Sequence, residues 1–221
     1  MTKVHMNPSE GQNQMLSIIL PCYNEYENIK EILESFNNLL AENKESLTYR
    51  KDIEVIIVDN GSTDESKSLL KDIEVKYNFC RSIRIEENKG YGHGIKEGVQ
   101  ISKGEIIGWT HADLQADPLD VLKAFDLMKS EKNLTPIFVK GLRNSRPIKD
   151  EVFTKGMSVF ESLLFLTPMR DINAQPNIMH REFYNLCQNP PDDFSFDLYY
   201  YILAKKNKCL IKRFPVFFKP R

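Results

Sequence analysis

Four short polar segments carry the side chains of this sequence that are best suited to chemistry. They are PCYNEYEN (21–28), DNGSTD (59–64), ENKGYGHG (87–94) and HADLQAD (111–117). Together they offer carboxylates, amides and two imidazoles, which can bind a divalent cation and hydrogen-bond a polar small molecule.

The segment HADLQAD has the pattern expected of a metal site. His111, Asp113 and Gln115 occupy alternate positions, so their side chains share one side if the segment is extended. An imidazole, a carboxylate and an amide oxygen could together coordinate a divalent cation. Helix capping is the simpler explanation for Asp117, which precedes Pro118, but it explains Asp113 poorly.

Asp59 ends an apolar run, where a carboxylate gains nothing from packing and could accept a hydrogen bond from a nucleobase N–H. The residues after it have a simpler explanation, since Asn60 and Gly61 favour a tight turn and STDE (62–65) predicts a helix capping box. The loop NKGYGHG lacks the full GxGxxG spacing of a dinucleotide site. This pattern is more typical of a flexible loop that lies beside a phosphate or a sugar.

The elements that must position these segments alternate between strand and helix. Apolar runs predict strands at 16–21, 54–59, 81–86, 105–110 and 136–141, and helical periodicity predicts helices at 29–40, 62–76, 94–102 and from 118 to about 128. Such alternation is typical of an α/β fold with a mostly parallel sheet. Ligands of these sheets bind beyond the carboxyl ends of the strands, where all four polar segments should meet.

The second half of the chain reads as an elaboration of the same domain. A basic loop, GLRNSRPIKD (141–150), precedes an amphipathic helix at 152–166, a segment at 171–179, helices near 181–188 and 196–207, and strands near 210–218. We expect a flexible N-terminal tail at 1–14 and one domain at 15–221, because no linker interrupts it.

Composition excludes several classes of function. The 30 basic and 31 acidic residues give a net charge of -1, which provides no field for gathering nucleic acid. The four cysteines form no CxxC pair, the N-terminus lacks a signal-peptide pattern, and the longest apolar stretch, 159–166, is far short of the ~20 residues that cross a bilayer. We expect a cytoplasmic protein that meets a membrane only from the side, at its inner face.

The four segments, in this order and at these separations, resemble the family 2 glycosyltransferases. The resemblance is strongest to those that transfer sugars to polyprenyl phosphates, such as the dolichol-phosphate mannose synthases, and it extends from Leu16 onward. It implies a single GT-A domain, Rossmann-like, with a nucleotide-sugar-binding half at about 15–118 and an acceptor half at about 119–221. It also implies a UDP- or GDP-sugar donor and Mg²⁺ or Mn²⁺.

The resemblance assigns roles in the donor half. Pro21, Tyr23 and Glu25 would line the nucleotide pocket and Asp59 would read the base. Asp113 and Gln115 would hold the cation. The remaining donor-side positions are Gly90, Gly92, His111 and Ala112. His111 replaces the first acid of the usual DAD pattern, which favours Mn²⁺ over Mg²⁺ if its imidazole is a ligand.

In the acceptor half, KGLRNSR resembles the family's G-x-R segment, so Arg143, with Arg146 nearby, either clamps a phosphate or belongs to a solvated basic loop. The DINAQP segment (171–176) would shape the acceptor side through Asp171, Asn173 and Gln175. Asp197 either caps a helix or serves as an acceptor-site acid.

The mechanism implied is inversion by direct attack of the acceptor, with Asp113, Asp197 and Arg143 as the catalytic candidates. An alcohol of a glycan would need a carboxylate base, Asp197 or Asp171, whereas a lipid phosphate is already ionised and needs only positioning by Arg143. Tyr199, Tyr200 and Tyr201 could stack on a sugar, although at least one should be core.

Two other functions compete with this interpretation. A nucleotidyltransferase would show a glycine-rich basic loop after the first strand, which PCYNEYEN is not. A non-catalytic nucleotide-sugar-binding protein is the other alternative, suggested by His111.

Overall fold

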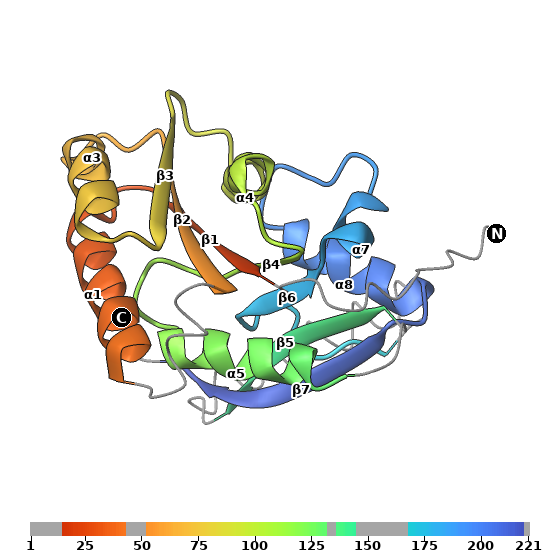
Figure 1. Cartoon of the computed structure of the whole chain (residues 1–221). Helices are drawn as coiled ribbons and strands as arrows, with labels where there is room; N and C mark the ends of the chain where they lie inside the picture. The colour runs from red at the N-terminus through yellow and green to blue at the C-terminus, as the bar shows by residue number, and fades with distance from the viewer. Residues whose placement is uncertain (1–14, 43–51, 132–135, 145–167, 219–221) are drawn as a thin grey trace.

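The computed structural model describes residues 15–42, 52–131, 136–144 and 168–218, which form one α/β domain around a seven-stranded sheet (Figure 1). The strands are β1 (Leu16–Cys22), β2 (Ile53–Asn60), β3 (Cys80–Ile85), β4 (Ile106–Trp109), β5 (Ile137–Asn144), β6 (Asn177–His180) and β7 (Leu210–Phe217). The helices are α1 (Tyr26–Glu42), α3 (Ser66–Lys76), α4 (Tyr91–Ile101), α5 (Pro118–Lys129), α7 (Arg181–Asn185) and α8 (Phe196–Lys206).

The sheet is mostly parallel, as predicted. Its order is β3-β2-β1-β4-β6-β5-β7. Only β6 runs antiparallel to its neighbours, β4 and β5. The sequence predicts no strand at β6, because four residues are too few to show a period of two. The parallel register pairs Leu16 with Ile53 and Cys22 with Asp59, so β1 and β2 end together.

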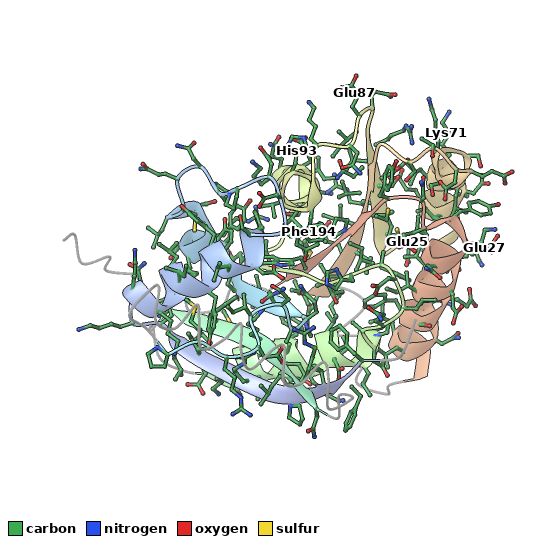
Figure 2. All side chains as sticks on the ribbon, turned by 180° about the vertical axis from the view of Figure 1, so that it is seen from behind. Glu25, Glu27, Lys71, Glu87, His93 and Phe194 are labelled. Atoms are coloured by element: carbon green, nitrogen blue, oxygen red, sulfur yellow. The ribbon has the colours of Figure 1, made fainter. Side chains whose placement is uncertain are left out.

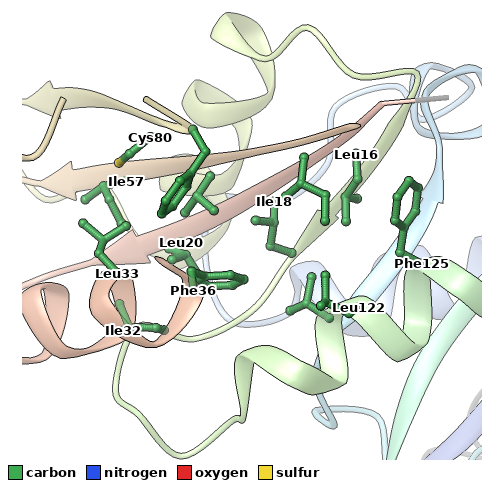
Figure 3. Packing of buried hydrophobic residues seen from close by; sticks show 14 of the residues in the cluster. Leu16, Ile18, Leu20, Ile32, Leu33, Phe36, Ile57, Cys80, Leu122 and Phe125 are labelled. Atoms are coloured by element: carbon green, nitrogen blue, oxygen red, sulfur yellow. The ribbon is translucent and has the colours of Figure 1, made fainter. Parts of the chain in front are cut away.

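Both faces of the central strands are buried, which explains their uninterrupted apolar runs. Alternate residues of β1 belong to opposite faces. Leu16, Ile18 and Leu20 pack with residues of α1, α3 and α5 (Figure 3). Ile19 belongs to the other core cluster, whose members include residues of α4 and α8.

Three helix starts differ from the sequence predictions, and the first is that of α1, which begins at Tyr26, three residues before the predicted start. The capping box at Ser62 is wrong, because α3 begins only at Ser66 and the residue before it makes no side-chain cap. Helix α4 begins at Tyr91, three residues before the predicted start, so Gly92 lies inside the helix. The helix predicted at 152–166 and Arg146 lie outside the described residues. Among the helices that the structure describes, none is long and apolar enough to cross a membrane.

Helix α4 lies against the sheet through Gly98. A Cβ placed on Gly98 would lie 2.5 Å from Ile19 Cγ2 and 2.9 Å from Val58 Cγ2, and both partners are fully buried. The close approach of α4 to β1 and β2 therefore requires a residue without a side chain at this position.

We expect Gly98→Val to lower the free energy of unfolding by about 1–3 kcal/mol, because a well-packed core cannot absorb the added carbons without strain. Gln100→Val, at an exposed position of the same helix, is the matched control and should change stability by only a few tenths of a kcal/mol or so. Urea unfolding of the three proteins measures the difference. Equal effects of the two substitutions would show that α4 does not rest on Gly98.

Candidate functional site

A cavity of about 350 Å³ lies where β1, β2 and β4 end and α4 begins. Glu25 and Phe194, labelled in Figure 2, both line it although they are far apart in the sequence. The lining residues are Pro21, Cys22, Tyr23, Glu25, Asn60, Asn88, Gly90, Tyr91, His111, Ala112, Asp113 and Phe194. All four polar segments therefore contribute to one cavity, as the parallel topology requires.

The structure separates the residues predicted for this site into two groups. Those that line the cavity are Pro21, Tyr23, Glu25, Gly90, His111, Ala112 and Asp113. Those that are described but absent from its lining are Asp59, Gly92, Gln115, Arg143, Asp171, Gln175 and Asp197. Most members of the second group are engaged elsewhere in the protein.

Asp59 stabilises the turn after β2 rather than facing the cavity. Its side chain is 0% exposed; Oδ1 accepts a hydrogen bond of 2.9 Å from the backbone N–H of Ser62, and Oδ2 pairs with the guanidinium of Arg84. This differs from the predicted contact with a nucleobase, which needs an accessible carboxylate oxygen. Its neighbour Asn60 does line the cavity, and Asn60 Nδ2 donates to the carbonyl of Gly90 at 2.8 Å.

The HADLQAD segment bends instead of running straight, so the predicted alternation of its side chains is wrong. Leu114 has a φ of 60°, and the backbone N–H of Gln115 donates to Asp113 Oδ1 at 3.2 Å. A left-handed residue reverses the direction of the chain, which leaves His111 and Asp113 on the cavity and Gln115 outside its lining. Asp117 caps α5 by accepting from the N–H of Leu119, which confirms its predicted role.

His111 and Asp113 form a donor set that suits an open cation site. Burial lowers the pKa of His111, so its imidazole is neutral and keeps a lone pair at neutral pH. Among the described residues, no group of three His, Cys, Asp or Glu side chains gathers into a protein cage. Mg²⁺ is commonly held by one or two carboxylates together with substrate phosphates, and this donor set fits that arrangement.

The start of α4 adds a second feature suited to an anion. Gly90 precedes the helix with a φ of 106° and lines the cavity together with Tyr91, the first helical residue. The first N–H groups of a helix carry partial positive charge, which favours phosphate groups. The cavity thus combines a carboxylate of the kind that holds cations with a helix end of the kind that suits phosphates.

Behind the cavity wall, Asp197 and Gln175 belong to a buried chain of hydrogen bonds. Asp197 is 3% exposed. It accepts from Trp109 Nε1 and Gln175 Nε2, each at 2.7 Å. Gln175 also donates to the hydroxyl of Tyr91 at 3.1 Å and accepts from Asn177 Nδ2 at 2.7 Å. Asp197 and Gln175 are therefore buried and hydrogen-bonded within the protein, and their role on the acceptor side stays a prediction.

Lys140 is the last residue in this series of hydrogen bonds, and its side chain is fully buried. Its Nζ donates to the carbonyl of Ala174 at 2.8 Å and to Asn177 Oδ1 at 2.5 Å. Burial lowers the pKa of Lys140 to about 7, against the attraction of Asp197. A neutral amine has two N–H groups, which matches the two acceptors.

Arg143 and Asp171 pair with each other. Asp171 Oδ1 accepts from Arg143 Nε at 2.7 Å and lies 2.6 Å from Nη2, and Oδ2 accepts from the backbone N–H of Arg143 at 2.6 Å. Both side chains are largely buried. The structure therefore differs from the predicted separate roles, a phosphate clamp and an acceptor-side acid, because each charge neutralises the other.

Sequence reasoning missed several lining residues, above all Tyr91 and Phe194. The sequence predicted a stacking aromatic among residues 199–201. Tyr200 and Tyr201 are buried in the core, which confirms the prediction that at least one of the three is a core residue. Phe194 is instead 75% exposed and stacks on Tyr91, with ring centroids 5.2 Å apart and an interplanar angle of 12°. A lone phenylalanine in a loop gives no pattern in the sequence.

Comparison with known proteins identifies a family whose model matches most of this chain. The family model described as glycosyl transferase family 2 matches residues 17–185. A dolichol-phosphate mannosyltransferase of Pyrococcus furiosus is 27% identical over 160 residues, which are 71% of this chain and 43% of that protein. A dolichyl-phosphate beta-glucosyltransferase of Mus musculus is 31% identical over 131 residues, 58% of this chain and 38% of that protein. The chain thus spans less than half the length of these relatives.

Solved structures share the fold. A glucosyl-3-phosphoglycerate synthase from Mycobacterium tuberculosis, in complex with phosphoglyceric acid, superposes with a TM-score of 0.69 at 15% identity, covering 94% of this chain and 73% of that one. A mannosyltransferase from Pyrobaculum calidifontis in complex with GDP-Man and Mn²⁺ gives a TM-score of 0.65 at 20% identity, covering 97% and 58%. The architecture is therefore the GT-A fold.

We expect Asp197→Asn to lower the free energy of unfolding by about 1–3 kcal/mol, because an amide would point its N–H₂ at Trp109 or Gln175, both of which are donors here. Urea unfolding followed by the fluorescence of Trp109, the single tryptophan, measures the change. Asp72→Asn, at an exposed position of α3, is the control. Wild-type stability in Asp197→Asn would contradict a supporting role.

The lowered pKa of Lys140 predicts a dependence of stability on pH. Between about pH 7 and the ordinary lysine pKa of about 10.4, the unfolded chain binds a proton that the folded protein does not, so this group makes stability rise with pH. Above about pH 7, the free energy of unfolding of the wild-type protein should rise, relative to that of Lys140→Met, by up to about 1.4 kcal/mol per pH unit.

The measurement is urea unfolding of both proteins at several pH values in this window. The offset caused by removing the two hydrogen bonds is the same at every pH and cancels in the slope. A difference that stays constant with pH would show that Lys140 is charged in the folded protein.

Proposed function

Since the chain belongs to glycosyl transferase family 2, we propose that it transfers a sugar from a UDP- or GDP-sugar to an acceptor with the help of Mg²⁺ or Mn²⁺. The observation that carries the proposal is the cavity in which the Asp113 carboxylate and the N-terminal end of α4 meet. A nucleotide diphosphate needs both a cation and N–H donors for its phosphates.

The donor half, about 15–118, provides the contacts. Pro21, Tyr23 and Glu25 lie at the end of the cavity formed by β1 and the start of α1 and would contact the nucleoside. Gly90 would place its neighbouring N–H groups on the diphosphate, and Asp113 with His111 would hold the cation. When bound, the cation neutralises charge that develops on the departing diphosphate. The solved structures that share this fold include complexes with UDP and Mn²⁺, with UDP and Mg²⁺, and with GDP-Man and Mn²⁺, which supports this assignment.

The acceptor half, about 119–221, favours an acceptor that is already ionised. Asp171 and Asp197, the predicted bases, are both hydrogen-bonded within the protein and absent from the cavity lining. A lipid phosphate needs no base for its attack, whereas a glycan hydroxyl does. Relatives are named for dolichyl phosphate and undecaprenyl phosphate acceptors. We therefore favour a polyprenyl phosphate, reached by peripheral contact with the inner face of a membrane, and direct attack with inversion.

Asp113→Asn is the test of this function. We expect it to reduce Mn²⁺-dependent transfer or slow hydrolysis by about 100-fold or more, because a neutral amide is a much weaker cation ligand than a carboxylate. Asp117→Asn is the matched control, since asparagine caps a helix as well as aspartate does. The measurement uses UDP-, GDP- and dTDP-sugars with and without Mn²⁺, with a polyprenyl phosphate as acceptor.

Three outcomes would oppose the proposal in different ways. Equal losses of activity in Asp113→Asn and Asp117→Asn would show that Asp113 has no special role. Binding of a nucleotide sugar without transfer or hydrolysis would favour the non-catalytic binding protein. Failure of the unaltered protein to bind any of these nucleotide sugars would refute the proposed function altogether.

A further inference from the structure

Among the aromatic residues that line the cavity, Phe194 has the most exposed side chain, at 75%. Single exposed hydrophobic residues are ordinary, but this one is stacked on Tyr91 at the edge of a cavity. Tyr91 in turn lies beside the imidazole of His111, with centroids 5.5 Å apart and an angle of 41°. Three rings from three segments thus form a continuous aromatic wall.

The stacked pair is held from both sides. The Tyr91 hydroxyl accepts from Gln175 Nε2 at 3.1 Å, which fixes that ring from behind. The loop that carries Phe194 is fixed by Asp192, whose carbonyl accepts from the N–H of His93 at 3.0 Å and whose carboxylate lies 2.6 Å from Lys96 Nζ. His93 and Phe194, labelled in Figure 2, belong to these two touching segments.

Close backbone contact also joins the loop to α4. A Cβ on Gly92 would lie 2.3 Å from the carbonyl oxygen of Pro191, and one on Gly90 would lie 2.4 Å from that of Asp192. Glycines at these two positions allow the loop to approach the helix. Phe194 is therefore an exposed ring on an anchored segment.

The position of the pair indicates its ligand. Tyr91 opens α4 in the donor half, and Phe194 precedes α8 in the acceptor half. On the proposed function, the group that lies between the two halves is the sugar being transferred. A pyranose ring has an apolar C–H face for stacking and hydroxyls at its edge, and the same cavity offers Asn88 as a polar partner.

We propose that Tyr91 and Phe194 form a stacking platform for the hexose ring of the donor nucleotide sugar. The platform rests on the proposed function, because it assigns a subsite within the same cavity. It separates sugar recognition from the nucleotide contacts near Pro21 and from the cation ligand Asp113. Phe194 provides the accessible ring, and Tyr91 holds that ring in place.

The test compares binding of a nucleotide with binding of its sugar conjugate. Titration calorimetry with Mn²⁺ measures UDP against UDP-glucose and GDP against GDP-mannose. We expect Phe194→Ala to weaken the affinity for the sugar conjugate about tenfold. Its affinity for the bare nucleotide should stay within about twofold of the wild-type value. Phe194→Tyr should restore binding, since it keeps the ring. Phe217→Ala removes a 62% exposed phenylalanine of β7 that lies outside the cavity lining and should change neither ligand.

If Phe194→Ala binds the nucleotide and the sugar conjugate with equally weakened affinity, or binds both as tightly as the wild-type protein, the stacking platform is refuted. The proposed function would not be affected by either result. If the unaltered protein binds none of the four probes, the platform and the proposed function fall together. The result for the unaltered protein thus tells the two failures apart. Thermal unfolding of Phe194→Ala checks that the variant is folded, which its exposure favours.

Discussion

The buried hydrogen bonds of Asp197 are the interaction on which the site depends most. They join Trp109 at the end of β4 to Gln175 ahead of β6, and through Asn177 they reach Lys140 in β5. Every member of this chain is nearly or completely buried. Because an unsatisfied buried polar group is costly, each member holds the next in one orientation. Gln175 also donates a hydrogen bond to the hydroxyl of Tyr91, so the same network fixes a residue that lines the cavity.

The antiparallel strand β6 makes this connection possible. It lies between β4 and β5, so it brings the end of the 171–176 segment against the strand that leads into the HADLQAD bend. On the other side, Gly141 of β5 lets the same segment approach closely, because a Cβ there would lie 2.1 Å from the carbonyl oxygen of Gln175. The backbone pairing of β4 with β6 therefore links the strands that precede α5 to the strands that follow it.

Internal pairing decides which charges remain for ligands. Arg84 is paired with Asp59, and Arg143 with Asp171. Bidentate or multiple contacts between arginine and carboxylate are strong and geometrically specific, so these four residues are engaged within the protein and lie outside the cavity lining. The cavity keeps the carboxylates of Glu25 and Asp113 in its lining. This distribution suits a ligand that brings its own negative charge and a cation with it.

Local patterns in the sequence were enough to predict every described strand except β6, a mostly parallel sheet and the edge at which ligands bind, because buried parallel strands leave long apolar runs followed by polar ends. The same patterns placed Pro21, Glu25 and Asp113 together. They could not show that Leu114 bends the HADLQAD segment, that Asp59 and Asp197 are covered, or that Phe194 stacks on Tyr91. Those features depend on contacts between segments as much as about a hundred residues apart, such as the approach of the 190–195 loop to α4. Residue type and spacing thus decided which chemistry is available, and tertiary packing decided which side chains are left open to perform it.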